Sequence, residues 1–417
     1  MVQPRPKAAI SDRPFQMTNR FAILFILMTV VIDAMGIGLI MPVMPGLIRE
    51  VGGGGLADAA IWGGILSTSF AVMQFLFGPL LGRLSDAFGR RPVLLVSLVV
   101  MAADYLVMAL AGTIWLLLAG RIVGGITAAT HSTANAFMAD ISAPENKARN
   151  FGLIGAAFGA GFVLGPVLGG LLAEYGTRAP FYLAAALALG NAIFGALILP
   201  ETVTDRTRRT FYWRGANPFS AFKGLAHLPA IRPLSLVFFF YQMANVVYPA
   251  IWAYFCTERF GWSPGMIGVS LALYGLFMAA AQGMLVAPAI RRFGETRTVL
   301  IGLSIECATL LILVFLSSGT VTLALIPVIC LGAVGLPALQ GILSRATPDD
   351  SQGELQGVLS SVTSVAMIAG PIVMTQIFAM FTRDGAALYL PGAPFLLAAV
   401  MMALALMIFA RVARPEN

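Results

Sequence analysis

The sequence predicts an all-α polytopic membrane protein, with twelve transmembrane helices in two pseudo-symmetric six-helix bundles. Of its 417 residues, 59% are hydrophobic and 11% are charged, whereas soluble domains carry about 25% charged residues. The mean hydropathy is +0.87. Apolar windows of about 20 residues, the length that crosses a bilayer as a helix, recur along the whole chain. An internal repeat at an offset of 205 residues indicates that the two halves are related.

Glycine, proline and charged residues divide the chain into twelve apolar segments. The spans are expected at 21–44, 60–81, 92–112, 114–138, 150–173, 179–199, 233–255, 264–289, 298–317, 320–343, 355–380 and 392–411. The expected domains are a tail at 1–20, a bundle at 21–200, a central loop at 201–232, a bundle at 233–411 and a tail at 412–417. The first apolar stretch is longer than a signal-peptide core of about 15 residues and lacks a small-residue cleavage site, so it is expected to remain as a span.

The distribution of basic residues predicts the orientation of the chain. Of the 26 Lys and Arg residues, 21 fall on the side that carries both expected tails, and Arg121 falls within a span. The other side has four: Arg49, Arg178, Arg259 and Arg383. The positive-inside rule therefore places both termini in the cytoplasm. This topology accounts for the net charge of +7, so no nucleic-acid partner is expected.

The repeat joins matching positions in the two halves at the fixed offset of 205. The matches are Gly78 with Gly283, Phe88-Gly89 with Phe293-Gly294, Gly152 with Gly357, and Gly165-Pro166 with Gly370-Pro371. Parallel repeats of this kind bury a midplane binding site between two halves that rock against each other.

The short loop between the second and third spans reads GPLLGRLSDAFGRRPVLL, residues 78–95. We expect its glycines to permit close backbone approach and its charges to surround a helix end. The pattern resembles the loop signature of the major facilitator superfamily. The resemblance implies a cytoplasmic gate, in which the charges hold one conformation against the start of the eleventh helix. The gate residues are expected to be Gly82, Ser85, Asp86, Gly89, Arg90, Arg91 and, at the end of the fourth span, Asp140. A loop that only sets topology is the alternative, but topology does not require Asp86.

The fifth span contains GAAFGAGFVLGPVLGG, residues 155–170. Its glycines recur every four residues and leave one helix face nearly bare, while the proline removes a backbone hydrogen bond. The residues concerned are Gly161, Gly165, Pro166, Gly169 and Gly170. Glycine spacing alone also fits a general helix-packing face. The combined Gly-Pro and Gly-Gly pairs resemble the fifth-span motif of drug/proton antiporters.

Four ionisable residues fall within the spans, where charge is costly and usually functional. They are Asp33, Asp104, Arg121 and Glu306. We expect Arg121 to face a carboxylate or a cavity, and we expect the carboxylates to take up and release protons. The less favoured alternative for any one of them is a structural interhelical hydrogen bond, and for Arg121 also a side chain that snorkels to the membrane interface.

Other polar residues within spans are expected to line a substrate cavity. They are Gln74, His131, Asn135, Gln242, Asn245 and Gln340, although a packed neutral ring is the better interpretation of His131. Cys256, Cys307 and Cys330 have no CxxC spacing, so neither a disulfide framework nor a metal site is expected.

Several segments resemble the tetracycline/proton antiporters of Gram-negative bacteria, over about residues 21–370. They are IDAMGIGLIMPVMP (32–45), SDAFGRRPVLL (85–95), DYLVMAL (104–110), GRIVGGITAAT (120–130), TERFGWSP (257–264) and GLPALQGILS (335–344). The resemblance implies that Asp33, Asp104 and Glu306 are the membrane carboxylates of coupled transport and that Arg121 is the buried cation. It also assigns the gate to Ser85, Asp86 and Arg90.

The chain departs from the family pattern at two places. Glu306 stands where aspartate is usual, and the stretch 264–300 lacks a histidine that many members carry.

The resemblance implies export of tetracycline as a chelate with Mg²⁺ or another divalent cation, driven by the proton gradient across the bacterial inner membrane. No resident cofactor or metal and no obligatory protein partner are expected. An antiporter for another amphipathic compound and a nutrient symporter are the alternatives within transport. An enzyme is disfavoured, because the chain has two histidines and neither HExxH nor G-x-S-x-G.

Overall fold

The computed structural model describes residues 13–128, 130–203, 208, 211, 217–221, 228 and 231–413. Most of the expected tails and of the central loop lie outside these residues. The helices of the first half are α1 (Arg13–Ile40), α2 (Met44–Gly52), α3 (Leu56–Phe88), α4 (Arg90–Leu110), α5 (Ile114–Thr127), α6 (Thr130–Ile141), η1 (Pro144–Asn146), α7 (Lys147–Leu172), η2 (Ala173–Tyr175) and α8 (Ala179–Ile198). One short helix of the central loop is described, η4 (Pro218–Ala221).

The second half is also helical throughout its described residues. Its elements are α10 (Arg232–Asn245), α11 (Val247–Phe260), α12 (Pro264–Ala280), η6 (Ala281–Leu285), α13 (Val286–Phe315), α14 (Gly319–Gly332), α15 (Gly335–Arg345), η7 (Asp349–Ser351), α16 (Gln352–Thr382) and α17 (Ala393–Val412). The predicted all-α membrane fold is confirmed.

Eleven continuous helical stretches of the described residues are long and apolar enough to cross a membrane. The longest of them, Pro264–Phe315, is two spans joined at Gly294, whose φ of 74° and ψ of 164° are not helical. Gly89, the matching residue of the first half, has φ 115° and separates α3 from α4 in the same way. Counting the stretch as two spans gives the twelve that the sequence predicts.

Capping residues set several of the helix ends. The side chains of Thr113, Ser263 and Ser318 accept hydrogen bonds from backbone N–H groups in the first turns of α5, α12 and α14. Backbone N–H groups in the first turn of a helix have no partner within the helix, and caps of this kind supply one. Gly261 ends α11 in the left-handed conformation, with φ 63°.

Three spans are interrupted, and the sequence analysis did not predict this. The fourth consists of α5 and α6, the seventh of α10 and α11, and the tenth of α14 and α15. α5 ends at Thr127 and α14 at Gly332, which are 205 residues apart, so this interruption is part of the repeat. Interrupted helices at matching positions of two halves are typical of transporter binding sites.

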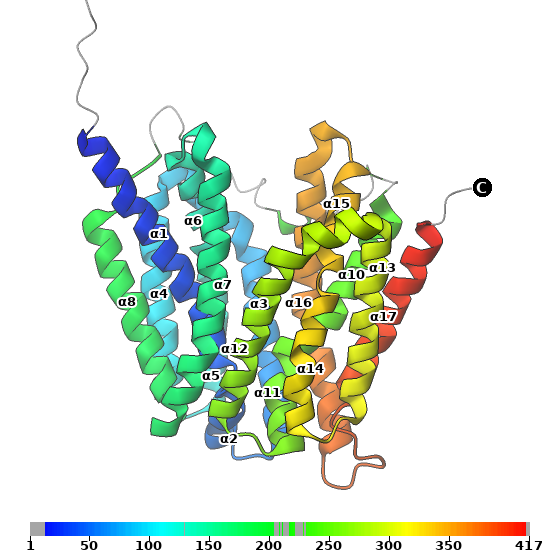
Figure 1. Cartoon of the computed structure of the whole chain (residues 1–417). Helices are drawn as coiled ribbons and strands as arrows, with labels where there is room; N and C mark the ends of the chain where they lie inside the picture. The colour runs from blue at the N-terminus through cyan, green and yellow to red at the C-terminus, as the bar shows by residue number, and fades with distance from the viewer. Residues whose placement is uncertain are drawn as a thin grey trace, which may run out of the picture.

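The halves pack together through two equivalent helix pairs, α3 with α16 and α7 with α12. α7 and α16 begin at Lys147 and Gln352, again 205 residues apart. Figure 1 shows the first-half helices α1, α4, α7 and α8 on one side and the second-half helices α10, α13, α16 and α17 on the other. α1 begins and α17 ends at the same end of the bundle, which we call the terminal end.

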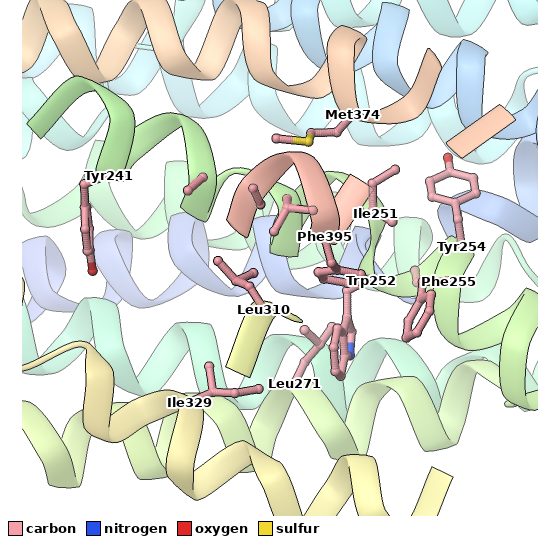
Figure 2. Packing of buried hydrophobic residues seen from close by; sticks show 14 of the residues in the cluster. Tyr241, Ile251, Trp252, Tyr254, Phe255, Leu271, Leu310, Ile329, Met374 and Phe395 are labelled. Atoms are coloured by element: carbon pink, nitrogen blue, oxygen red, sulfur yellow. The ribbon is translucent and has the colours of Figure 1, made fainter. Parts of the chain in front are cut away.

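The core of the second half is rich in aromatic side chains. Phe255 and Phe395 meet edge to face, with ring centroids 4.9 Å apart, and Trp252 packs beside both. Figure 2 shows these rings grouped between aliphatic side chains, with Tyr241 at one edge of the cluster. This packing ties α11 to α17 and supports the cavity wall that α11 forms.

Candidate functional site: a cavity between the two halves

A cavity of about 370 Å³ lies between the halves. The first half contributes residues of α1 to α6, and the second half contributes residues of α11 and α16 and Val246 between α10 and α11. The ionisable residues of its wall are Asp33, Asp104, Tyr105, Arg121 and Tyr254. Most other lining residues are apolar, and they include Met41, Met44, Met101 and Met367. An apolar cavity with a few convergent polar groups is typical of a small-molecule site.

Asp104 and Arg121 form an ion pair on the cavity wall, between α4 and α5. The guanidinium also lies over the ring of Phe70, 5.0 Å from its centroid. A Cβ at Gly124 would lie 2.7 Å from Asp104 Oδ2, so a glycine there leaves the carboxylate its room. The pair fulfils the expectation that Arg121 faces a carboxylate. Asp104 Oδ1 and Arg121 Nε are buried and have no hydrogen-bond partner among the described residues.

Asp33 lines the same cavity from α1 and is not fully buried. It makes no hydrogen bond or ion pair with the residues that the structure describes. Tyr105 is close-packed against α1 at this level, since a Cβ on Gly36 would overlap its hydroxyl group. Asp33 therefore adds to the cavity wall a carboxyl group that no described residue neutralises.

Gln74 lines the cavity as predicted, and it also bonds to a backbone carbonyl group at the interruption of the fourth span. Its Nε2 donates to the carbonyl oxygen of Ala128 at 3.3 Å, just after α5 ends. Thr127, Ala128 and Thr130 also line the cavity. Freed backbone groups inside a membrane are tolerated where a polar side chain or a cavity meets them.

Four other residues predicted for the cavity do not line it. Asn135 is half-buried in α6 away from the wall, and Gln340 is exposed on α15. Gln242 donates to Thr363 Oγ1 at 3.0 Å, and Asn245 donates to Glu306 at 3.0 Å. These two amides therefore form hydrogen bonds to side chains of α16 and α13 and do not face the cavity. The side chain of His131 lies outside the described residues.

Glu306 is separate from the cavity. It is buried inside the second half, where Tyr241 Oη donates to its Oε1 at 2.9 Å and Asn245 Nδ2 donates to its Oε2 at 3.0 Å. The structure thus groups Asp33, Asp104 and Arg121 and leaves Glu306 in a second polar cluster. The role of all four in proton coupling stays a prediction.

At the terminal end, the predicted gate residues converge on one guanidinium. Arg90 contacts Asp86, donates to Ser85 Oγ at 3.1 Å and donates to Asp140 Oδ2 at 3.2 Å. We call Ser85, Asp86, Arg90 and Asp140 the Arg90 cluster. Arg91 points elsewhere and donates to the carbonyl oxygen of Ala196 at 2.7 Å.

Glu201 also belongs to this loop and was not identified from the sequence. Its carboxylate accepts from the backbone N–H groups of Arg90 at 2.9 Å and Arg91 at 3.2 Å, and so caps α4. A Cβ at Gly89 would lie 2.3 Å from Glu201 Oε2, which explains the glycine. At Gly82 no described atom lies within 4 Å of an added Cβ, so the close approach expected there is not seen.

The second half repeats the ion pair with its charges exchanged. Arg90 and Asp140 correspond at the offset of 205 to Glu295 and Arg345, which form an ion pair between α13 and α15. An ion pair that joins the third and fourth spans of one half therefore has an inverted counterpart joining the ninth and tenth.

The glycine-rich face of α7 packs directly on the backbone of α1. Added Cβ atoms at Gly161, Gly165 and Gly169 would lie 2.3–2.4 Å from carbonyl oxygens of α1. Gly170 lies against the start of α12, and Gly268 of α12 lies against Pro166. The motif therefore brings α7 close both to the helix that carries Asp33 and to the other half.

Comparison with known proteins decides the family. The model of the Major Facilitator Superfamily matches residues 26–250 and 234–417. The class C tetracycline resistance protein of Escherichia coli is 42% identical over 388 residues, which cover 91% of this chain and 97% of that protein. The chain belongs to the tetracycline resistance proteins of the major facilitator superfamily. The class G protein of Vibrio anguillarum is 39% identical, with 86% of this chain and 91% of that protein covered.

Solved structures of transporters share the fold of this superfamily member. The human organic anion transporter MFSD10 has a TM-score of 0.68 at 24% identity, and it covers 94% of this chain and 99% of its own. A D-xylose–proton symporter has a TM-score of 0.75 at 17% identity, with 95% and 98% covered. The predicted architecture and family are both confirmed.

Proposed function

We propose that this protein exports tetracycline from the cytoplasm in exchange for protons and thereby confers resistance. The observation that carries the proposal is the match to six tetracycline resistance proteins, of classes B to E, G and H, at 35–42% identity over 84–92% of this chain. We place the protein in the bacterial inner membrane with both termini in the cytoplasm, because the terminal side carries most of the Lys and Arg residues.

The cavity supplies the chemistry that such an exchange needs. Its apolar wall suits the rings of the drug, and Asp33 offers an acidic group that no described side chain neutralises. We take Mg²⁺ or another divalent cation to arrive as part of the drug chelate, as substrate rather than as a resident cofactor. Asp33 meets the positive part of that chelate and, when the drug has left, takes a proton in its place.

Alternating access then couples export of the drug chelate to entry of the proton. The proton taken up at Asp33 from outside permits the halves to rock so that the cavity opens to the cytoplasm, and binding of the chelate favours release of the proton there. The Asp104–Arg121 pair keeps a fixed charge arrangement beside Asp33 during the exchange. The proton gradient is the energy source.

The test uses inverted membrane vesicles with an imposed proton gradient. Wild-type vesicles are expected to accumulate tetracycline, and to do so faster with Mg²⁺ present than with a chelator. Asp33→Asn keeps the shape of the side chain but removes its charge and its proton exchange, so it should abolish gradient-driven uptake at unchanged membrane abundance. Retained coupled uptake in Asp33→Asn would refute this role.

A wider substrate range is the second candidate function. Methionine side chains adapt to different ligand shapes, and four of them line the cavity: Met41, Met44, Met101 and Met367. Vesicle uptake of a panel of amphipathic compounds separates the two proposals. Gradient-driven uptake of the others at rates near that of tetracycline would identify a multidrug antiporter.

A further inference from the structure

The second half contains a polar cluster that the proposed cycle above does not use. It consists of Glu306 on α13 and of Tyr241 and Asn245 on α10, which donate to its two oxygens. We call these three residues the Glu306 cluster. Glu306 is 4% exposed and forms no ion pair among the described residues. A buried intramembrane carboxylate without a cation is costly and is retained where it has a function.

The cluster lies where a helix is interrupted. Asn245 is the last residue of α10, and α11 begins at Val247. Besides holding Glu306, Asn245 Nδ2 donates to the carbonyl oxygen of Tyr241 at 3.1 Å, inside the last turn of α10. One amide therefore joins the carboxylate of α13 to the end of α10.

The next residue already belongs to the cavity wall. Val246 lines the cavity, and its side chain occupies the space beside Gly370 on α16, where an added Cβ would lie 2.5 Å from Val246 Cγ1. α16 in turn contacts α3 of the first half, since Thr68 Oγ1 donates to the carbonyl oxygen of Ile368 at 2.9 Å. A short chain of contacts thus leads from Glu306 to the interface between the halves.

A second interruption adjoins the cluster. α14 ends at Gly332, where an added Cβ would lie 2.4 Å from Glu306 Cγ. Glu306 is therefore packed between the α10–α11 and the α14–α15 interruptions. Backbone groups at an interruption already lack their helical hydrogen bonds, so a change at Glu306 acts at two places where the helices of this half are broken.

We propose that Tyr241 and Asn245 are positioning residues that transmit protonation of Glu306 to the cavity wall through the interruption between α10 and α11. The inference rests on the proposed proton-coupled function. An ionised carboxylate accepts at both oxygens, whereas a protonated one carries a donor on one of them. The Tyr241 hydroxyl adapts because it both donates and accepts. The Asn245 NH₂ group only donates, so a proton on Oε2, the oxygen that it bonds, makes the amide rotate, and Val246 and α11 move with it.

The other titratable groups that face Glu306 are Tyr248 of α11, Tyr274 of α12 and Cys330 of α14. Ordinary phenols and thiols are uncharged at pH 7. α15 and α17 contribute only Arg345 and Arg411, which lie at helix ends. Proton exchange in this part of the bundle therefore falls to Glu306.

The experiment compares Asn245→Asp with wild type in the vesicle assay, across tetracycline concentrations and pH. Aspartate has the shape of asparagine but presents an acceptor where Glu306 needs a donor. Loss of a hydrogen bond to a charged group lowers a rate by about tenfold or more. We expect that fall in the maximal rate, a change in KM of less than about twofold, and a displaced pH profile. Tyr241→Phe should change the rate in the same direction by less.

Ser235→Ala is the matched control. Ser235 is buried on the same helix, and its hydroxyl group has no partner among the described residues. It should retain the wild-type rate and pH profile. A purely structural role for Asn245 predicts reduced abundance with an unchanged pH profile, and this would overturn the inference.

Two outcomes separate the inference from the proposed function. Wild-type vesicles that fail to exchange tetracycline for protons overturn the function itself. Wild-type vesicles that exchange them, while Asn245→Asp and Tyr241→Phe match wild type, overturn only the coupling role. If Asn245→Asp does not accumulate in the membrane, Asn245→Ala and Tyr241→Phe provide the same comparison of rate, KM and pH profile.

Discussion

Two aspartates share one cavity, but their surroundings differ. Asp104 is 5% exposed and is paired with Arg121, whose side chain is fixed over Phe70. Asp33 has no such cation among the described residues, and for this reason we propose it as the group that exchanges a proton for a positively charged ligand. The pair is costly to break, because either partner alone leaves an uncompensated buried charge.

The variant Arg121→Gln tests whether the loss of one partner of the Asp104–Arg121 pair destabilises the protein. Removal of one partner of a buried pair costs about 3–5 kcal/mol, whereas replacement of both partners by neutral groups costs much less. We therefore expect Arg121→Gln to lose thermal stability in detergent and the double variant Asp104→Asn/Arg121→Gln to recover most of it. Fluorescence-detected size exclusion after heating measures the surviving fraction. A double variant as unstable as Arg121→Gln would contradict the pairing argument.

At the scale of elements, Glu50 of α2 connects the ends of several helices outside the spans. Its carboxylate accepts from Thr177 Oγ1 and, at 3.0 Å, from Arg178 Nε. Arg178 also donates to the carbonyl oxygens of Ala109 at 2.8 Å and Ala111 at 2.9 Å, at the end of α4. The hydrogen bonds from Thr177 and then from Arg178 hold the pKa of Glu50 below its ordinary value of 4.5.

Because the pKa of Glu50 is lowered in the folded state, its contribution to the stability of the fold depends on pH in a known direction. The stabilisation by Glu50 is fully present above pH 4.5 and is lost as the pH falls through the lower folded-state value. Glu50→Gln should therefore melt below wild type at pH 7, and the difference should shrink as the pH drops below 4.5. Glu145→Gln, at an exposed site in η1, is the control and should show no such trend. A difference in melting temperature that is constant with pH would refute this contribution.

Hydropathy identified the spans well but could not reveal their interruptions. Most residues around Ala128, Val246 and Ala333 are apolar or small, so the hydropathy signal continues across each break. The breaks depend on partners from distant segments, such as Gln74 at the carbonyl oxygen of Ala128. Cavity residues were overpredicted for the same reason, because the helical phase of an amide does not show which distant helix it will satisfy.

Contacts between motif residues were predictable where the two charged residues lie close together in the sequence. Arg90 lies four residues after Asp86, one helical turn or a tight loop away, and their contact follows from the sequence. Glu201 was missed because it lies 111 residues from Arg90 and caps the loop only after α8 has packed on α4.

At the scale of the whole molecule, each half has its own ion pair at the terminal end. The pair is Arg90 with Asp140 in the first half and, with the charges exchanged, Glu295 with Arg345 in the second. Arg345→Glu places like charges in contact with Glu295, and the exchange Glu295→Arg/Arg345→Glu restores the attraction. Arg345 is well exposed, so we expect the single variant to lower the vesicle uptake rate by roughly twofold to fivefold and the exchange to recover it. Equal rates in both variants would show that the pair has no part in transport.

Rocking of the halves also requires that contacts at the other end break. Asp58 in the first turn of α3 and Arg383 after α16 form an ion pair of 3.0 Å between the halves, at the end opposite the Arg90 cluster. Both side chains are more than half exposed, so the pair itself is weak and separates easily. A covalent link at this point should instead hold the halves together and stop the exchange of sides.

The Asp58→Cys/Arg383→Cys variant, treated with a short bifunctional thiol reagent, should therefore lose vesicle uptake and regain it when a reductant cleaves the link. Each single cysteine variant with the same treatment is the control and should keep transporting, because it cannot bridge the halves. Full activity in the linked double variant would mean that this end stays closed throughout the cycle. Alternating access by rocking about the cavity would then be wrong.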